Sequence, residues 1–225
     1  MHIEPGIVHG AKMALSYATA AGAGAYTARI AWDMARDHGA APLVMRSIAA
    51  ALGTFVFFEV MPHFAVGVSE VHFILGTTLF LILGAAPAAI GLALGLLAQG
   101  ALFAPGDLPQ FAINVTTLLV PLFAVAALAE RIVPKDTAYV DLRYADVLKL
   151  SVVYQGGVVA WVAFWALYGQ GAGAENLAAV MSFGAAYMLV VIIEPVADLG
   201  VLAGAKALRG RTLGGLIQPR VHAAA

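Results

Sequence analysis

The chain lacks cysteine, carries few charges and contains no phosphate-binding loop. Without cysteine, disulfide bonds, thiolate metal ligands and cysteine nucleophiles are all excluded. Charged residues make up 11% of the 225 residues and hydrophobic residues 62%, whereas soluble domains are about 25% charged. The net charge of −1 gives no reason to expect a nucleic-acid partner. This composition predicts a protein of the lipid bilayer.

Sequence signatures of enzymes are missing as well. No HExxH, GxSxG or set of histidine boxes is present, so we expect a protein without covalent chemistry of its own. No G-x-x-x-x-G-K-[ST] segment is present either, so any ATP hydrolysis that drives the protein must take place in separate chains. The first residues show no basic segment followed by an apolar run and a small-residue cleavage site, so we expect Met1 to be retained.

Seven apolar stretches predict an all-α integral membrane protein, a single domain over 1–225 built as a bundle of seven transmembrane helices. A helix needs about 20 residues to cross the hydrocarbon core. The third and fourth stretches run together, and one helix of that length would rise about 48 Å, so we expect a hairpin of two short helices. The GAAP segment from Gly84 to Pro87 is the natural break, because proline removes a donor and disfavours helix before it. The predicted spans are 8–31, 43–62, 71–84, 87–103, 110–129, 146–168 and 176–206.

The distribution of basic residues predicts the orientation. With seven spans, all but Lys12 of the 12 lysines and arginines fall on one side of the membrane. Cytoplasmic loops carry the excess of Lys and Arg. We therefore expect a multi-pass protein of the cell inner membrane with its N-terminus outside and its C-terminus in the cytoplasm. Residues 207–225 are then a cytoplasmic tail.

The first two residues offer three nitrogens to a metal ion. The α-amine of Met1, the backbone nitrogen of His2 and the Nδ1 atom of His2 can close a five-membered and a six-membered chelate ring. A fourth nitrogen has two sources in one predicted exterior loop, His63 and His72. Tetragonal nitrogen sites suit Ni(II) or Cu(II), and imidazole also binds Co(II) and Zn(II). A lone histidine near a membrane surface is more often only solvated, so the motif alone leaves the question open.

Longer segments resemble a known family. The opening MHI is followed by Glu4 and Gly6, and the stretch SEVHFILGTTLFLILGAAPAAIGLALGLLAQGALF contains a Ser-x-x-His-x-x-x-Gly-Thr pattern and a Gln-Gly-Ala-Leu-Phe ending. GDLPQFAINVTTLLVPL follows, and Glu194 lies in VVIIEPVADLG. Together these segments resemble the CbiM/NikM family, the substrate-binding membrane subunits of energy-coupling-factor importers for cobalt and nickel. That family has seven spans and an exterior amino end.

The resemblance implies a near-planar set of four nitrogens that holds Ni(II) or Co(II) as the transported substrate, with no catalytic cofactor. Its ligands are Met1 (amine), His2 (amide and imidazole) and His72. Polar residues that match family positions would steady these ligands, namely Ser69, Gln99 and Asn114. The sequence departs from the family in having Glu4-Pro5-Gly6 where the family has proline or methionine before the acid, and in lacking a His-Pro in the loop. These departures leave the choice of metal open.

Two histidines, His9 and His63, have no counterpart in the family. His63 is a candidate accessory residue that relays ions, although a solvated position at the interface is the simpler interpretation. Glu59 lies near the outer end of its predicted span, where it is a second candidate for the site or its gate. Ionisable residues inside a membrane are functional candidates by default, and Glu194 and Asp198 also fall within a predicted span.

The resemblance also implies partners. An importer of this kind works with a membrane scaffold subunit, two ATPase subunits and a small accessory membrane subunit. Ala18/Gly22 and Ala21/Ala25 are small-xxx-small pairs that allow a partner helix to approach, although such pairs also pack helices within one bundle. The alternative is a self-contained, proton-coupled secondary cation transporter that uses Glu59, Glu194 and Asp198. Such transporters show internal repeats, and none is evident here.

Overall fold

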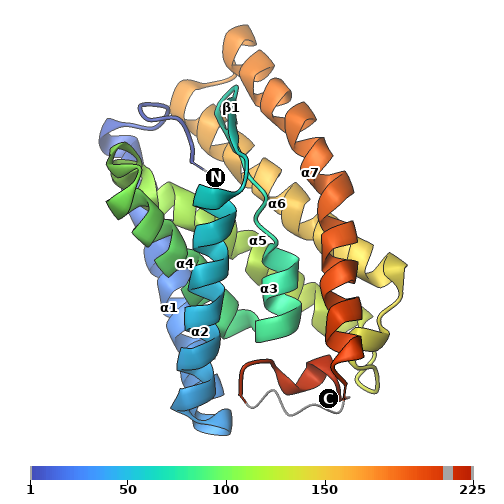
Figure 1. Ribbon diagram of the computed structural model, residues 1–225. Coiled ribbons are helices and arrows are strands. Elements are labelled where there is room, and N and C mark those ends of the chain that lie inside the picture. Colours follow the sequence, from blue (N-terminus) through green and yellow to red (C-terminus); the bar gives the residue numbers. More distant parts are fainter. Residues whose placement is uncertain (1, 210–214, 224–225) are drawn as a thin grey trace.

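The computed structural model describes residues 2–209 and 215–223 of the chain. The described part forms a bundle of seven α-helices with a two-stranded antiparallel sheet at one end (Figure 1). The helices are α1 (Met13–His38), α2 (Ala40–Phe55), α3 (Gly76–Leu83), α4 (Ala85–Leu102), α5 (Phe111–Ile132), α6 (Tyr144–Gln170) and α7 (Ala174–Ala207). The strands are β1 (Phe64–Val66) and β2 (Ser69–Val71). A π-helical turn, Val56–Val60, continues α2. Short 3-10 turns lie at Gly10–Lys12, Pro105–Gln110, Tyr139–Asp141 and Pro219–Val221.

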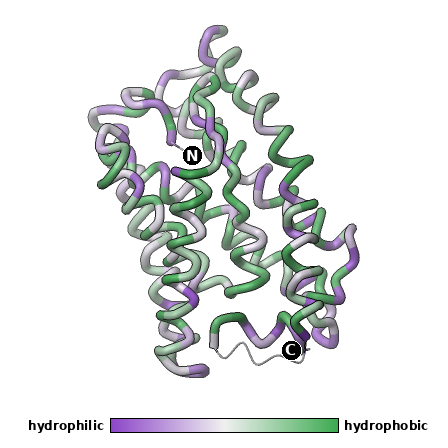
Figure 2. Tube along the Cα trace, in the orientation of Figure 1, coloured by the Kyte–Doolittle hydropathy of each residue, from purple (hydrophilic) through white to green (hydrophobic). Residues whose placement is uncertain are grey.

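Five of the described helical segments are both long enough and apolar enough to cross a membrane. They are Ala40–Val60, Ala85–Leu102, Pro105–Ile132, Tyr144–Gln170 and Ala174–Ala207. In a bilayer every backbone polar group must find an internal partner, which favours helices of this kind. Hydrophobic residues cover most of each helix, and hydrophilic ones gather in the loops and at helix ends (Figure 2). The prediction of a helical bundle is confirmed at this level, and the sheet is a feature that the all-α prediction omitted.

The third predicted span, 71–84, is wrong over its first residues. The helix α3 begins only at Gly76 and has 8 residues, which corresponds to about 12 Å of rise, less than half of the hydrocarbon core. Residues before it pair in β2 or are extended, and Leu75 has a φ of 50°, which is incompatible with a helix continuing through it. The third helix is therefore a short buried element and not a full crossing.

The break between α3 and α4 lies at Gly84, within the predicted GAAP segment. Gly84 has a φ of 98° and a ψ of 163°, a conformation that glycine adopts without the cost that a side chain imposes. Pro87 lies in the first turn of α4, where its missing N–H group is not needed. The glycine, and not the proline, therefore makes the turn between the two helices.

Small residues allow α2 and α4 to pack closely. A Cβ atom on Gly91 would lie 2.1 Å from the Cβ atom of Ala50, and one on Gly95 would lie 2.6 Å from the Cβ atom of Thr54. Small residues at such crossings are typical of membrane helices, where close van der Waals packing drives association. This packing places the C-terminal end of α2, with its π-helical turn, beside the C-terminal end of α4.

The two ends of the chain lie at opposite ends of the bundle (Figure 1). The N-terminal segment lies beside the sheet, whereas residues 215–223 fold back against the other end. The side chain of Gln218 donates hydrogen bonds to the carbonyl oxygens of Phe80 and Leu81, both at 2.7 Å, and its backbone nitrogen donates to Ile82 at 2.9 Å. The described part of the predicted tail therefore caps the last turn of α3. Residues 210–214 and 224–225 of that tail lie outside the described residues.

Candidate metal centre

The N-terminal segment joins the sheet as a third extended piece. The backbone nitrogen of Glu70 donates to the carbonyl of His2 at 3.1 Å, and the nitrogen of Glu4 donates to the carbonyl of Val68 at 3.1 Å. Ile3 pairs with Ser69 in an antiparallel bridge. Because these bonds fix the segment residue by residue, the side chain of His2 has one defined place beside β2.

Two glycines make room for this arrangement. Gly67 occupies the turn between β1 and β2 with a φ of 63°, and a Cβ atom there would lie 2.0 Å from the carbonyl oxygen of Ala179 in α7. A Cβ atom on Gly169 in α6 would lie 2.1 Å from the carbonyl oxygen of Ile7. Both glycines permit backbone to pack against backbone, so the sheet and the N-terminal segment lie directly on the bundle.

Two of the predicted steadying residues bind the peptide group between His2 and Ile3. The Oδ1 atom of Asn114 in α5 accepts a hydrogen bond from the nitrogen of Ile3 at 2.9 Å. The hydroxyl of Ser69 donates to the carbonyl of His2 at 2.9 Å. Gln110 adds a third bond, from its side-chain nitrogen to the carbonyl of Val8 at 3.1 Å. The segment is thus anchored by side chains from β2 and from the N-terminal end of α5.

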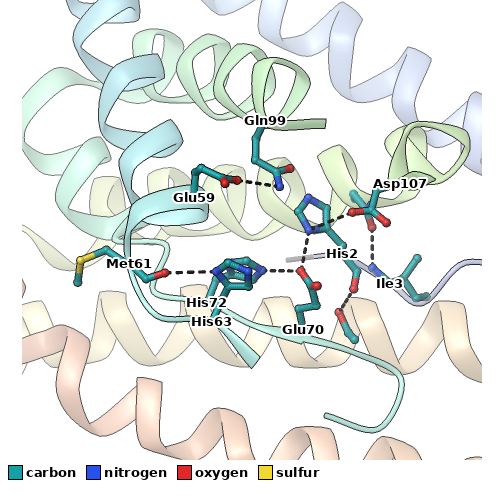
Figure 3. Close-up of polar contacts among 11 residues, drawn as sticks. His2, Ile3, Glu59, Met61, His63, Glu70, His72, Gln99 and Asp107 are labelled. Carbon is teal, nitrogen blue, oxygen red and sulfur yellow. Dashed lines mark hydrogen bonds and ion pairs between the residues drawn. The ribbon is translucent and has the colours of Figure 1, made fainter. Parts of the chain in front are cut away.

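The centre of the site is a cluster of His2, Glu70 and His72 (Figure 3). The Oε2 atom of Glu70 lies 2.8 Å from Nδ1 of His2 and 2.8 Å from Nε2 of His72. One ligand atom from each residue lies within 4.8 Å of the other two. Glu70 and His72 share one side of the chain because side chains two residues apart in extended backbone point the same way. The ionised carboxylate only accepts hydrogen bonds, so both imidazoles donate to it.

Aromatic rings enclose the two imidazoles. Phe58, from the π-helical turn, is fully buried, and its ring centroid lies 4.7 Å from that of His72 and 5.8 Å from that of His2. The exposed ring of His63 stacks on His72, with a centroid distance of 4.7 Å and an interplanar angle of 13°. His63 also lies 3.3 Å from the carbonyl of Met61 through its Nδ1 atom. His63 therefore covers His72 as a stacked ring.

Burial sets the protonation of the cluster. His2 is 4% exposed and His72 is 1% exposed. Burial disfavours the charged form of an imidazole, and it lowers the pKa of His72 to about 3 and also lowers the pKa of His2. Burial alone would raise the pKa of the Glu70 carboxyl, but the hydrogen bonds from His2 and His72 hold it well below its usual range. At neutral pH the cluster therefore holds two neutral imidazoles and one carboxylate, all in the form that binds cations.

The remaining predicted residues take other places. Gln99 contacts Glu59, with its side-chain nitrogen 3.5 Å from the carboxylate, beside the cluster (Figure 3). Glu59 is half-buried at the end of the π-helical turn. Gln99 was predicted to steady the ligands, and the structure pairs it with Glu59. Met1 lies outside the described residues.

Sequence reasoning missed two acidic residues. Glu70 stands two positions before His72 in SEVH, and the period of two in a strand would have placed it at the site had the hairpin been recognised. Asp107 lies in the 3-10 turn Pro105–Gln110, and its carboxylate is 3.6 Å from Nδ1 of His2. No periodicity in GDLPQ points to that position, so the sequence carried no signal for Asp107.

Comparison with known proteins identifies the family. A family model described as the cobalt uptake substrate-specific transmembrane region, CbiM, matches residues 2–211. The chain belongs to the CbiM family. A CbiM protein is a membrane component of metal uptake and not an enzyme. A search of curated proteins gave no match.

The fold of this CbiM protein has a relative among solved structures. The crystal structure of a truncated transition metal transporter superposes with a TM-score of 0.59 at 17% identity, covering 92% of this chain and 97% of that one. At this identity the likeness shows a shared fold. Together with the long apolar helices, the family match makes the chain an integral membrane protein of transition-metal transport.

Proposed function

We propose that this CbiM protein is the substrate-binding subunit of an energy-coupling-factor importer, and that it carries Ni(II) or Co(II). The observation that carries the proposal is the buried His2–Glu70–His72 cluster at the end of the bundle that holds the N-terminal segment. In this cluster the Glu70 carboxylate lies 2.8 Å from both imidazole rings. Membership of a cobalt-uptake family supports the same conclusion.

The proposed ligands are the Met1 amine, the backbone nitrogen and imidazole of His2, and the imidazole of His72. Nδ1 of His2 now donates to Glu70, so metal binding there requires the proton to leave Nδ1. Glu70 then either turns away or joins the ligands through an oxygen. Its negative charge offsets the charge of a dication in a buried site, where an unpaired charge is costly. Ser69 and Asn114 steady the first residues, because outer partners of ligands fix their orientation.

The proposed orientation places the cluster outside the cell and the Gln218 end of the bundle in the cytoplasm, in the inner membrane. The basic residues support this orientation, since Arg46, Arg143, Arg209 and Arg220 lie in or beside the elements at the Gln218 end. The proposed partners are a membrane scaffold subunit, two ATPase subunits and a small accessory membrane subunit.

Metal binding and vesicle uptake together test this function. Purified protein equilibrated with Ni(II) or Co(II) and desalted is expected to carry one ion per chain by mass spectrometry. Vesicles that contain this chain alone are expected not to accumulate the metal, because no phosphate-binding loop is present to use ATP. If vesicles with the chain alone accumulate metal in response to a proton gradient, the protein is a proton-coupled secondary transporter instead. If no metal binds, the cluster of His2, Glu70 and His72, here named the outer cluster, is not a cargo site.

A further inference from the structure

A second set of polar side chains lies deep in the bundle, away from the outer cluster. Glu194 and Asp198 are 0% and 1% exposed, one turn apart on α7. Around them lie Gln155 and Ser151 of α6 and Thr78 of α3. We propose that this group, the inner cluster (Thr78, Ser151, Gln155, Glu194 and Asp198), is a binding site for a divalent cation with oxygen ligands.

The charge of the inner cluster is the first argument. In the part of the chain that the structure describes, no lysine, arginine or histidine lies within ion-pair distance of Glu194 or Asp198. Two carboxylates in the interior of a membrane protein are rare and costly, and such residues usually pair with one another or mark an ion site. One dication neutralises both carboxylates.

Unpartnered oxygens are the second argument. Gln155 donates through its side-chain nitrogen to Glu194, and Thr78 donates to Asp198. This leaves Oε1 of Gln155 and Oδ2 of Asp198 buried without a hydrogen-bond partner among the described residues. Buried polar atoms are nearly always satisfied in native proteins. Because these acceptors belong to side chains already joined to or beside the two carboxylates, a cation held by the carboxylates would satisfy them too.

The chemistry of the donors sets the class of ligand. Carboxylate, amide and hydroxyl oxygens suit hard cations such as Mg(II), Ca(II) and Mn(II), whereas imidazole suits the later transition metals. Every donor of the inner cluster is an oxygen, so it differs in kind from the outer cluster of His2 and His72. Pro195 lies between the two carboxylates on α7, and a proline inside a helix loosens the backbone bonds around it.

The inner cluster is joined to the outer one through a short piece of chain. Glu194 accepts hydrogen bonds from the backbone nitrogens of Ile74 at 2.7 Å and Leu75 at 3.0 Å. These residues directly follow the segment that carries His72. A cation that draws Glu194 toward Asp198 competes with these two bonds, so occupancy of the inner cluster is linked to the position of His72.

The test uses full-length protein that lacks the outer ligands, so that its result does not depend on the proposed function. In the His2→Ala/His72→Ala variant, titration with Mn(II) followed by electron paramagnetic resonance is expected to show one bound ion per chain. Adding Glu194→Gln and Asp198→Asn is expected to weaken this binding at least tenfold. Both changes keep the shape of the side chains, and the amide oxygen introduced by Glu194→Gln still accepts from Ile74 and Leu75. Glu175→Gln, an exposed position in the first turn of the same helix, is the matched control.

Each outcome decides the proposal. If Mn(II) does not bind to the His2→Ala/His72→Ala variant, or if binding survives Glu194→Gln/Asp198→Asn, the inner cluster is not a cation site. Surviving binding would belong to outer carboxylates such as Glu70. If the double change alters the far-UV circular dichroism, Asp198→Asn alone gives the answer, because it removes one charge and keeps an acceptor for Thr78. Failure of the parent to retain Ni(II) or Co(II) would contradict the proposed function and leave this result standing.

Discussion

Asn114 holds the N-terminal segment in place, and replacing it should weaken metal binding. Its Oδ1 atom accepts from the nitrogen of Ile3 at 2.9 Å, and both residues are buried, at 2% and 1% exposure. Asn114→Leu keeps a similar volume and leaves this backbone donor without a partner. An unsatisfied buried donor costs about 1–3 kcal/mol. Because the metal ligands lie on the same segment, that cost appears as about a 5- to 150-fold loss of metal affinity, at about 1.4 kcal/mol for each tenfold.

Calorimetric titration of the purified protein with Ni(II) or Co(II) measures this loss. The matched control is Thr117→Val, one turn further along α5, where the hydroxyl donates only to Ile113 of the same helix. Thr117 is equally buried, at 2% exposure, and makes no bond to the N-terminal segment, so its affinity should stay at the parent value. Equal affinities for Asn114→Leu and the parent would refute the reasoning that docking of this segment limits metal binding.

Three further predictions concern the site and the opposite end of the bundle. His72→Ala removes a proposed ligand and should lower metal affinity by more than about 100-fold, since mutating even a residue that only hydrogen-bonds a ligand lowers affinity about 10- to 100-fold. An affinity close to that of the parent would remove His72 from the ligand set. Glu70→Gln removes the charge 2.8 Å from both imidazoles and should cost at least about tenfold in the same titration, whereas tighter binding would show that Glu70 only competes with the metal. Gln218→Ala removes the side-chain hydrogen bonds to two carbonyls of α3. It should lower the apparent melting temperature by several degrees, at about 2–4 °C for each kcal/mol of lost stability. An unchanged melting temperature would mean that residues 215–223 do not support the bundle.

Much of the bundle was predictable because hydrophobic runs and membrane thickness limit what a chain can form. The long apolar runs correspond to long helices, and the glycine of GAAP marks the turn before α4. The start of α3 was not predictable in this way. VHFIL is apolar enough for a helix, but the pairing of Val71 with β1 and the bonds from Ile74 and Leu75 to Glu194 keep it out of a helix. Glu194 lies far from this segment in the sequence, and hydrophobic periodicity does not predict such distant partners.

The site was partly predictable for the same reason. His2 and His72 meet at one end of the bundle, because the short N-terminal segment and the short hairpin that precedes α3 lie at the same end (Figure 1). The sequence did not predict Glu70 as a site residue, because its position depends on the strand β2, whose three residues are too few to show an alternating pattern. The contact of Gln218 with the end of α3 was not predicted either, since a polar side chain that caps another helix leaves no periodic signal in its own segment.

The central claim, that the first two residues hold the metal, is tested most directly by moving the amine. Inserting three alanines between Met1 and His2 leaves His2 and all later residues with their bonds to Ser69, Glu70 and Asn114, but it takes the amine out of the short chelate ring. Three alanines are used because one alanine would put the histidine third, where the amine, two backbone nitrogens and the imidazole form a four-nitrogen nickel chelate of their own. Metal content is then measured by mass spectrometry in the parent and the inserted variant. The account predicts one nickel or cobalt ion per chain in the parent and none in the variant. Equal metal content in both proteins would contradict it.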